Sequence, residues 1–128
     1  MHLTFHKTPW FLGARVTGDL DLSTAGEFKE KVDSEIRKTG LLNLILNLKG
    51  VGFIDSTGIA AILGRYKNVS ALGGKMVLID VPERISAMLD LAGMGSLIPR
   101  FRDLEEALAA MGLGEKMGEK TGEVRPVD

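Results

Sequence analysis

The chain has 128 residues, of which 45% are apolar and 26% charged, and its formal net charge is −1. This length suits one domain with a single core, and the even mixture of charges offers no basic field for nucleic acid or an anionic membrane. Because the sequence contains no cysteine, disulfides, thiolate metal sites and thiol chemistry are excluded.

The first third of the sequence predicts a strand pair followed by a helix. Residues 3–5 and 10–17 are short apolar or alternating runs on either side of a turn-like Thr-Pro pair, which indicates a hairpin. Apolar residues then recur at helical spacing over residues 23–38. Gly40 follows as the expected end of this amphipathic helix.

The middle of the sequence predicts a buried strand and a second helix. Residues 41–48 are apolar except for two asparagines, as in a strand at the centre of a sheet. After Asp-Ser-Thr-Gly at residues 55–58, apolar residues follow the helical template as far as Tyr66. Gly73 and the glycine after it end this unit.

The last third continues the alternation of strands and helices. Residues 76–79 predict a strand, residues 85–92 a helix, residues 97–98 a last short strand, and residues 104–111 a final helix that Asp103 caps. We therefore expect an α/β domain with a mixed sheet of four to five strands and about four helices.

Composition also predicts where the folded domain ends and where the protein is located. The expected domain spans residues 1–112, and residues 113–128 are Gly-rich and charged, which predicts a disordered C-terminal tail. The N-terminal segment lacks a long apolar run, and no segment reaches the roughly 18 apolar residues of a membrane span. We expect a cytoplasmic protein that does not bind membranes.

The sequence shows no apparatus for catalysis. Its histidines, His2 and His6, have no metal-ligand spacing, and no Gly-x-Ser-x-Gly turn presents a nucleophile. Residues 118–121 resemble a phosphate-binding loop only superficially, because Glu119 interrupts the Gly-Lys pair. We expect no enzymatic activity, no metal and no cofactor.

The Asp-Ser-Thr-Gly segment at residues 55–58 has two interpretations. In the first, Asp55 or Ser56 is only a helix N-cap, which would contribute about 1 kcal/mol. In the second, Ser56 is a reversible phosphorylation site at the helix start, where a phosphate would add about −1.5 to −2 charge at one surface point. The four residues alone do not distinguish these roles.

The flanks of this segment carry a family resemblance. They include Thr-Gly-Asp-Leu-Asp at residues 17–21, Ile-Leu-Gly-Arg-Tyr-Lys at residues 62–67, and Gly-Gly-Lys-Met-Val at residues 73–77. With Asp-Ser-Thr-Gly between them, the sequence resembles the STAS-domain anti-anti-sigma factors, and among them the anti-sigma F factor antagonists of sporulation. The likeness covers roughly residues 3–112 in order.

The resemblance implies a regulator of transcription controlled by partner switching. The unphosphorylated protein would bind an anti-sigma factor that is also a serine kinase, and so free the sigma factor. That kinase would phosphorylate Ser56 and thereby end the binding, and a PP2C-like, metal-dependent serine phosphatase would restore it. The protein is then expected to be a monomer or weak dimer.

The resemblance also implies roles for neighbouring residues. Asp55 would cap the helix, orient the serine or meet the kinase, and Thr57 would bond the backbone of the first turn. Gly58 would allow close approach, either of a partner or of the sheet beneath the helix. Asp21 is a candidate partner contact, or a plain helix-start acid. Arg65 is a candidate contact on an exposed helix face, or an ordinary solvated residue.

Two other classes of function remain open. A STAS domain can instead be a scaffold or accessory subunit of a larger signalling or transport assembly, which would self-associate strongly. A sensor of a small anion or nucleotide would use the same helix start. The absence of a Gly-rich phosphate loop from the sequence argues against the sensor.

Overall fold

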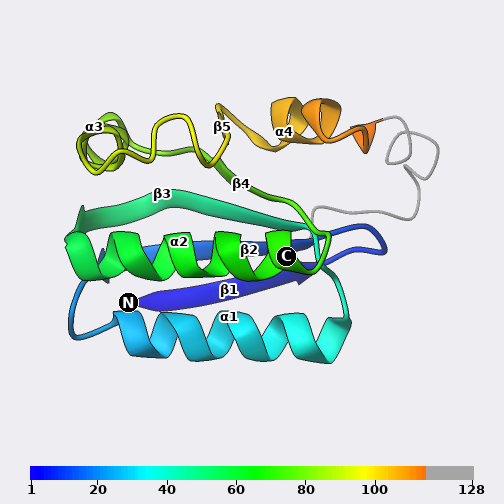
Figure 1. Ribbon diagram of the computed structural model, residues 1–128, viewed down its shortest axis with the longest axis horizontal. Coiled ribbons are helices and arrows are strands. Elements are labelled where there is room, and N and C mark those ends of the chain that lie inside the picture. Colours follow the sequence, from blue (N-terminus) through cyan, green and yellow to red (C-terminus); the bar gives the residue numbers. More distant parts are fainter. Residues whose placement is uncertain (115–128) are drawn as a thin grey trace.

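The computed structural model describes residues 1–114, and the chain alternates strands and helices after an initial strand pair (Figure 1). The elements in chain order are β1 (His2–Lys7), β2 (Leu12–Leu20), α1 (Ala25–Thr39), β3 (Leu44–Ile54), α2 (Ser56–Ala71), β4 (Met76–Ile79), α3 (Glu83–Leu91), β5 (Arg100–Phe101) and α4 (Leu104–Ala110).

The strands form one mixed sheet in the order β1-β2-β3-β4-β5. β1 and β2 are antiparallel, and every later neighbour is parallel. The parallel pairs follow from the helix that intervenes between their strands, whereas the short turn at Thr8 permits only a hairpin. The predicted hairpin, the mixed sheet and the central position of β3 are confirmed.

Strands β2 and β3 are both longer than the sequence predicts. β2 continues to Leu20 and β3 to Ile54, and these two last residues are register partners. The extension contains Gly, Asp and Lys, residues with low strand propensity, so periodicity does not reveal it. Its buried residues Val51 and Ile54 anchor it to the main core.

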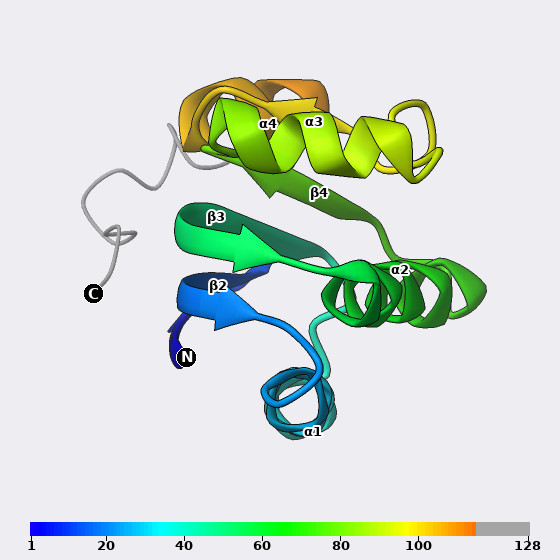
Figure 2. The same cartoon turned by 90° about the vertical axis from the view of Figure 1, so that its left-hand side faces the viewer.

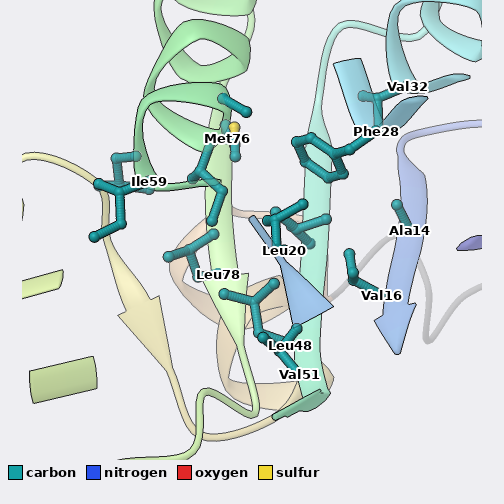
Figure 3. Close-up of a cluster of buried hydrophobic side chains, with 14 of the residues drawn as sticks. Ala14, Val16, Leu20, Phe28, Val32, Leu48, Val51, Ile59, Met76 and Leu78 are labelled. Atoms are coloured by element: carbon teal, nitrogen blue, oxygen red, sulfur yellow. The ribbon is translucent and has the colours of Figure 1, made fainter. Parts of the chain in front are cut away.

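The helices cover the two faces of the sheet unequally. α1 and α2 lie side by side against one face (Figure 2). On this side the main core packs Phe28 and Val32 of α1 and Ile59 of α2 against strand residues such as Leu20 and Leu78 (Figure 3). α4 packs against the opposite face in a smaller cluster around Ile45 and Val77 of the sheet.

The helix ends follow from local chemistry. Gly40 closes α1 in the left-handed conformation (φ 70°), which glycine adopts without a steric penalty. The Asp103 carboxylate accepts a hydrogen bond from the backbone N–H of Glu106 (2.9 Å) and so caps α4. Both ends were predicted from the sequence and are confirmed.

The predicted strand at residues 97–98 is wrong. These residues lie in a turn, and β5 forms instead at Arg100 and Phe101, which pair with β4. Ile98 is apolar because its side chain is buried in the main core, not because it belongs to the sheet. The next residue, Pro99, has no N–H to donate, although its carbonyl accepts from Leu78 N (2.9 Å).

The residue directly after the expected domain boundary at residue 112 is buried. Leu113 is buried in the smaller cluster with α4, so the packed chain continues past Gly112. The remainder of the predicted tail, residues 115–128, lies outside the described residues. None of the helices within residues 1–114 is long and apolar enough to cross a membrane.

Arg65 joins α1 to α2, and its predicted exposure is wrong. Its side chain is buried, with 7% of the residue exposed, and its Nε lies 3.0 Å from Asp33 Oδ1 of α1. A long aliphatic stem can be buried while its charged head approaches a carboxylate, here that of partly exposed Asp33. Arg65 therefore connects the two helices and does not lie on an exposed helix face.

This ion pair generates a stability prediction. Asp33→Ala leaves a buried guanidinium unpaired and should lower the free energy of unfolding by about 1–3 kcal/mol. Glu27→Ala is the matched control, since it removes the exposed partner of Lys31 (2.7 Å) from the same helix and should cost less than about 0.5 kcal/mol. Equal effects of the two variants in urea unfolding would contradict the structural role of Arg65.

Candidate functional site

The candidate site lies where β2 and β3 end. Leu20 and Ile54 are the last residues of these parallel strands and are register partners, so the loop into α1 and the start of α2 leave the sheet side by side. The arrowheads of both strands point toward this end in Figure 2. Carboxyl ends of parallel strands are common ligand or partner sites, because loops rather than core residues line them.

Asp55 is the cap of α2 and a bridge to the neighbouring loop. Its Oδ1 accepts from the backbone N–H groups of Thr57 (2.9 Å) and Gly58 (3.0 Å). Its Oδ2 accepts from the backbone N–H of Leu22 (3.2 Å), which belongs to the loop between β2 and α1. The capping role expected of Asp55 is therefore observed, and the same carboxylate also fixes the position of that loop.

Ser56 is the first residue of α2, and it is exposed to solvent. Thr57 is only half-exposed, and its backbone N–H is held by Asp55. Of the two adjacent hydroxyl residues, Ser56 is the more accessible, as a phosphoacceptor must be. A phosphate added there would extend away from the core, because the buried residues of this turn are those that follow it.

Gly58 lets α2 approach the end of β2. It is buried, and a Cβ at this position would lie 2.1 Å from the Leu20 carbonyl oxygen and 2.9 Å from Ile54 Cγ1. The same carbonyl accepts a hydrogen bond from Asp55 N (3.4 Å). Of the two roles expected for Gly58, the structure accounts for packing against the sheet.

Asp21 organises the loop before α1. Its Oδ1 accepts from the Ser23 hydroxyl (2.8 Å) and the Ser23 backbone N–H (3.0 Å), and its own carbonyl accepts from Ala25 N (2.8 Å). The hydrogen bond from the Ser23 hydroxyl is the main cause that lowers the pKa of Asp21 below its ordinary value. Asp21 is thus a helix-start acid at the same end of the sheet as Ser56.

Arg65 is not part of this site. It lies nine residues after Ser56 on a straight helix, about 13 Å along the axis. Its side chain is also buried, beside partly exposed Asp33. The structure brings Asp21, Asp55, Ser56 and Thr57 to one end of the sheet and leaves Arg65 away from them.

Sequence reasoning missed two exposed apolar residues beside this site. Leu22, between Asp21 and Ser23, is 77% exposed, and Phe53, near the end of β3, is 51% exposed. An apolar residue flanked by loop-forming polar residues was the available signal for Leu22. Phe53 carried no such signal, because the sequence did not reveal that β3 continues to this point.

The Gly58 contact gives a prediction with an internal control. Gly58→Ala forces a Cβ into the backbone of β2 and should lower the free energy of unfolding by about 1–3 kcal/mol or more. Gly64→Ala lies in the same helix, where an added Cβ would meet nothing within 4 Å, and should stabilise by roughly 0.5–1 kcal/mol. Thermal or urea unfolding measures both, and a neutral Gly58→Ala would show that the helix does not need this approach.

The Asp21 hydrogen bonds give a pH prediction. Because the folded-state pKa is lowered, the stabilisation is present above the ordinary pKa of an aspartate and is lost as the pH falls through the folded value. Ser23→Ala removes the main donor and should move the Asp21 pKa back toward its ordinary value in an NMR titration of the carboxyl carbon. Ser70→Ala, at an exposed position near the other end of α2, is the control and should leave that titration unchanged.

Comparison with known proteins agrees with this geometry. The STAS domain model matches residues 4–107 of the chain. An anti-sigma F factor antagonist of Paenibacillus polymyxa is 32% identical over 97 residues, which cover 76% of this chain and 83% of that protein. The residues matched by the STAS model include the main helices, the start of α2 and nearly all of the sheet.

Solved structures share the fold. The unphosphorylated form of the anti-sigma factor antagonist SpoIIAA superimposes with a TM-score of 0.73 at 20% identity, covering 87% of this chain and 97% of that chain. SpoIIAA of Bacillus in its phosphorylated form gives a TM-score of 0.66 at 22% identity, covering 86% of this chain and 99% of that chain. From the sequence matches and the fold together, the chain belongs to the STAS-domain family and, within it, to the anti-sigma factor antagonists, which are regulators rather than enzymes.

Proposed function

We propose that this protein is the switch component of a partner-switching pathway. In its unphosphorylated form it binds an anti-sigma factor that is also a serine kinase, and so frees the sigma factor. The kinase phosphorylates Ser56, which ends the binding, and a PP2C-like phosphatase removes the phosphate. The observation that carries this proposal is the exposed Ser56 hydroxyl at the first position of α2, beside a capped and packed helix start.

The local structure supports a reversible modification at Ser56. Residues near Ser56 stabilise this turn, since Asp55 caps the helix and Gly58 packs on Leu20. A phosphate on Ser56 therefore requires no core residue to move. Ser56 can therefore be modified without loss of a contact that stabilises the fold.

The charges around Ser56 support the consequence of phosphorylation. Asp55 lies directly before Ser56, and Asp21 lies in the loop that Asp55 holds. A phosphate would add about −1.5 to −2 charge to this already acidic end. A partner surface that receives a neutral hydroxyl would then meet a concentrated negative charge that it must desolvate, which weakens binding.

Relatives with the same fold support control by phosphorylation. The Paenibacillus polymyxa protein is named for antagonism of an anti-sigma factor, and SpoIIAA has been solved in phosphorylated and unphosphorylated forms. Two facts favour phosphorylation over passive capping. A protein with the same fold occurs in a phosphorylated form, and Ser56 of this chain is exposed. We propose the same kind of control here, with a monomer or weak dimer as the active species.

The direct test is intact-mass analysis after incubation with ATP and an anti-sigma serine kinase. The anti-sigma F factor of Paenibacillus polymyxa is the first kinase to use, because its antagonist is the relative described above. Wild type should gain one phosphate, Thr57→Ala should gain one as well, and Ser56→Ala should gain none. The phosphorylated protein should bind the kinase at least about tenfold more weakly than the unmodified protein.

The same samples decide against the proposal if they behave otherwise. A phosphate that persists in Ser56→Ala would move the switch to another residue. An unmodified wild type, with cognate kinases shown to phosphorylate their own antagonists, would refute the switch. A large assembly in light scattering would then favour the scaffold function.

A further inference from the structure

Two exposed apolar residues belong to the segments that adjoin the proposed switch. Leu22 is 77% exposed and Phe53 is 51% exposed. The backbone N–H of Leu22 is bonded to Asp55, and Phe53 is separated from Asp55 only by buried Ile54. Single exposed apolar residues are common, but these two belong to the two segments that Asp55 connects, the loop before α1 and the end of β3. We call these two residues the apolar pair.

The loop that carries Leu22 is held in one conformation by hydrogen bonds. Asp55 Oδ2 accepts from Leu22 N (3.2 Å), and the Thr24 hydroxyl donates to the Asp19 carbonyl (2.9 Å). The Asp21 backbone N–H in turn donates to Thr24 Oγ1 (2.9 Å). The loop therefore displays an apolar side chain to solvent while its backbone is fixed. Such preorganisation lowers the entropy that a partner must overcome on binding.

The charges next to the apolar pair are mainly negative. Asp19 and Asp21 precede Leu22, and Asp55 lies between Phe53 and Ser56 in the sequence. Arg84 of α3 borders the other side, where its Nη2 donates to the Gly52 carbonyl (2.7 Å). A partner that fits this end of the sheet needs apolar recesses for the Leu22 and Phe53 side chains. It also needs basic residues around the recess for Leu22.

We propose that Leu22 and Phe53 are the apolar anchors through which the unphosphorylated protein binds its anti-sigma factor. The anti-sigma factor would receive them in apolar recesses bordered by Lys or Arg side chains that face Asp19 and Asp21. This inference rests on the proposed function. It names the contacts around Ser56 through which phosphorylation would weaken binding of the anti-sigma factor. Closure of an apolar contact around Ser56 excludes water, so a phosphate there would be buried without its hydration.

The test compares three substitutions at exposed positions. Leu22→Ala and Phe53→Ala remove the anchors, and Leu72→Ala is the matched control. Leu72 is 65% exposed and caps the opposite end of α2. Affinity is measured by calorimetry with the anti-sigma F factor of Paenibacillus polymyxa, using protein that carries no phosphate. Far-ultraviolet circular dichroism and melting temperature show that each variant is folded.

Both anchor variants should bind about tenfold or more weakly than wild type, and Leu72→Ala should bind within about twofold of it. Raising the ionic strength should weaken wild-type binding, and Asp19→Asn should reduce that salt dependence.

The outcomes separate this inference from the proposed function. If wild type binds and both anchor variants bind equally well, the anchors are wrong and the switch stands. If Leu72→Ala weakens binding as much as Leu22→Ala, the loss is not local to this surface and the anchors are again wrong. If wild type neither binds nor is phosphorylated, the proposed function fails and the anchors fail with it.

Discussion

The hydrogen bonds of the Asp55 carboxylate hold together the end of the molecule that carries Ser56. One oxygen satisfies two backbone N–H groups at the start of α2, and the other satisfies the backbone N–H of Leu22. The first two bonds replace intrahelical partners that the first turn of any helix lacks. The third ties α2 to the loop before α1. A single side chain thus sets the geometry of two segments that the sheet brings together.

Packing beneath this carboxylate makes the arrangement possible. α2 can begin this close to β2 only because Gly58 places no side chain against the Leu20 carbonyl. Farther along the same helix, buried Arg65 pairs with partly exposed Asp33 and joins α2 to α1. The helix that carries Ser56 is therefore held at its start by backbone contact and in its middle by an ion pair. Ser56 itself takes no part in either contact, and so it is available for modification.

The sequence was a good guide to the elements and a poor guide to the surface. Helical spacing in α1 and α2, the apolar run of β4, and the caps at Gly40 and Asp103 are local patterns, and the structure confirms them. The extension of β3 through Gly50 to Ile54 depends on pairing with distant β2, which local propensity does not encode.

Burial explains the residues that were misjudged in the site. Arg65 looks like a surface residue on chemistry alone, and only the position of α1 and its Asp33 shows that it is buried. Leu22 and Phe53 look like core residues on chemistry alone, yet both are exposed. In each case the position in the fold runs against the usual preference of the residue type. The flanks of Ser56 carry the family resemblance, and only the structure shows that Ser56 itself is exposed.

The bond between Asp55 and Leu22 also has a consequence for incompletely folded copies of the protein. These residues are 33 positions apart in the chain. The contact joins segments that follow the neighbouring strands β2 and β3, so it is a non-local contact that local helix formation cannot supply. A nascent or partly unfolded chain therefore carries the serine hydroxyl without the assembled surface around it. A kinase that recognises the surface together with the hydroxyl would pass over such chains, so that only completely folded molecules enter the regulatory cycle.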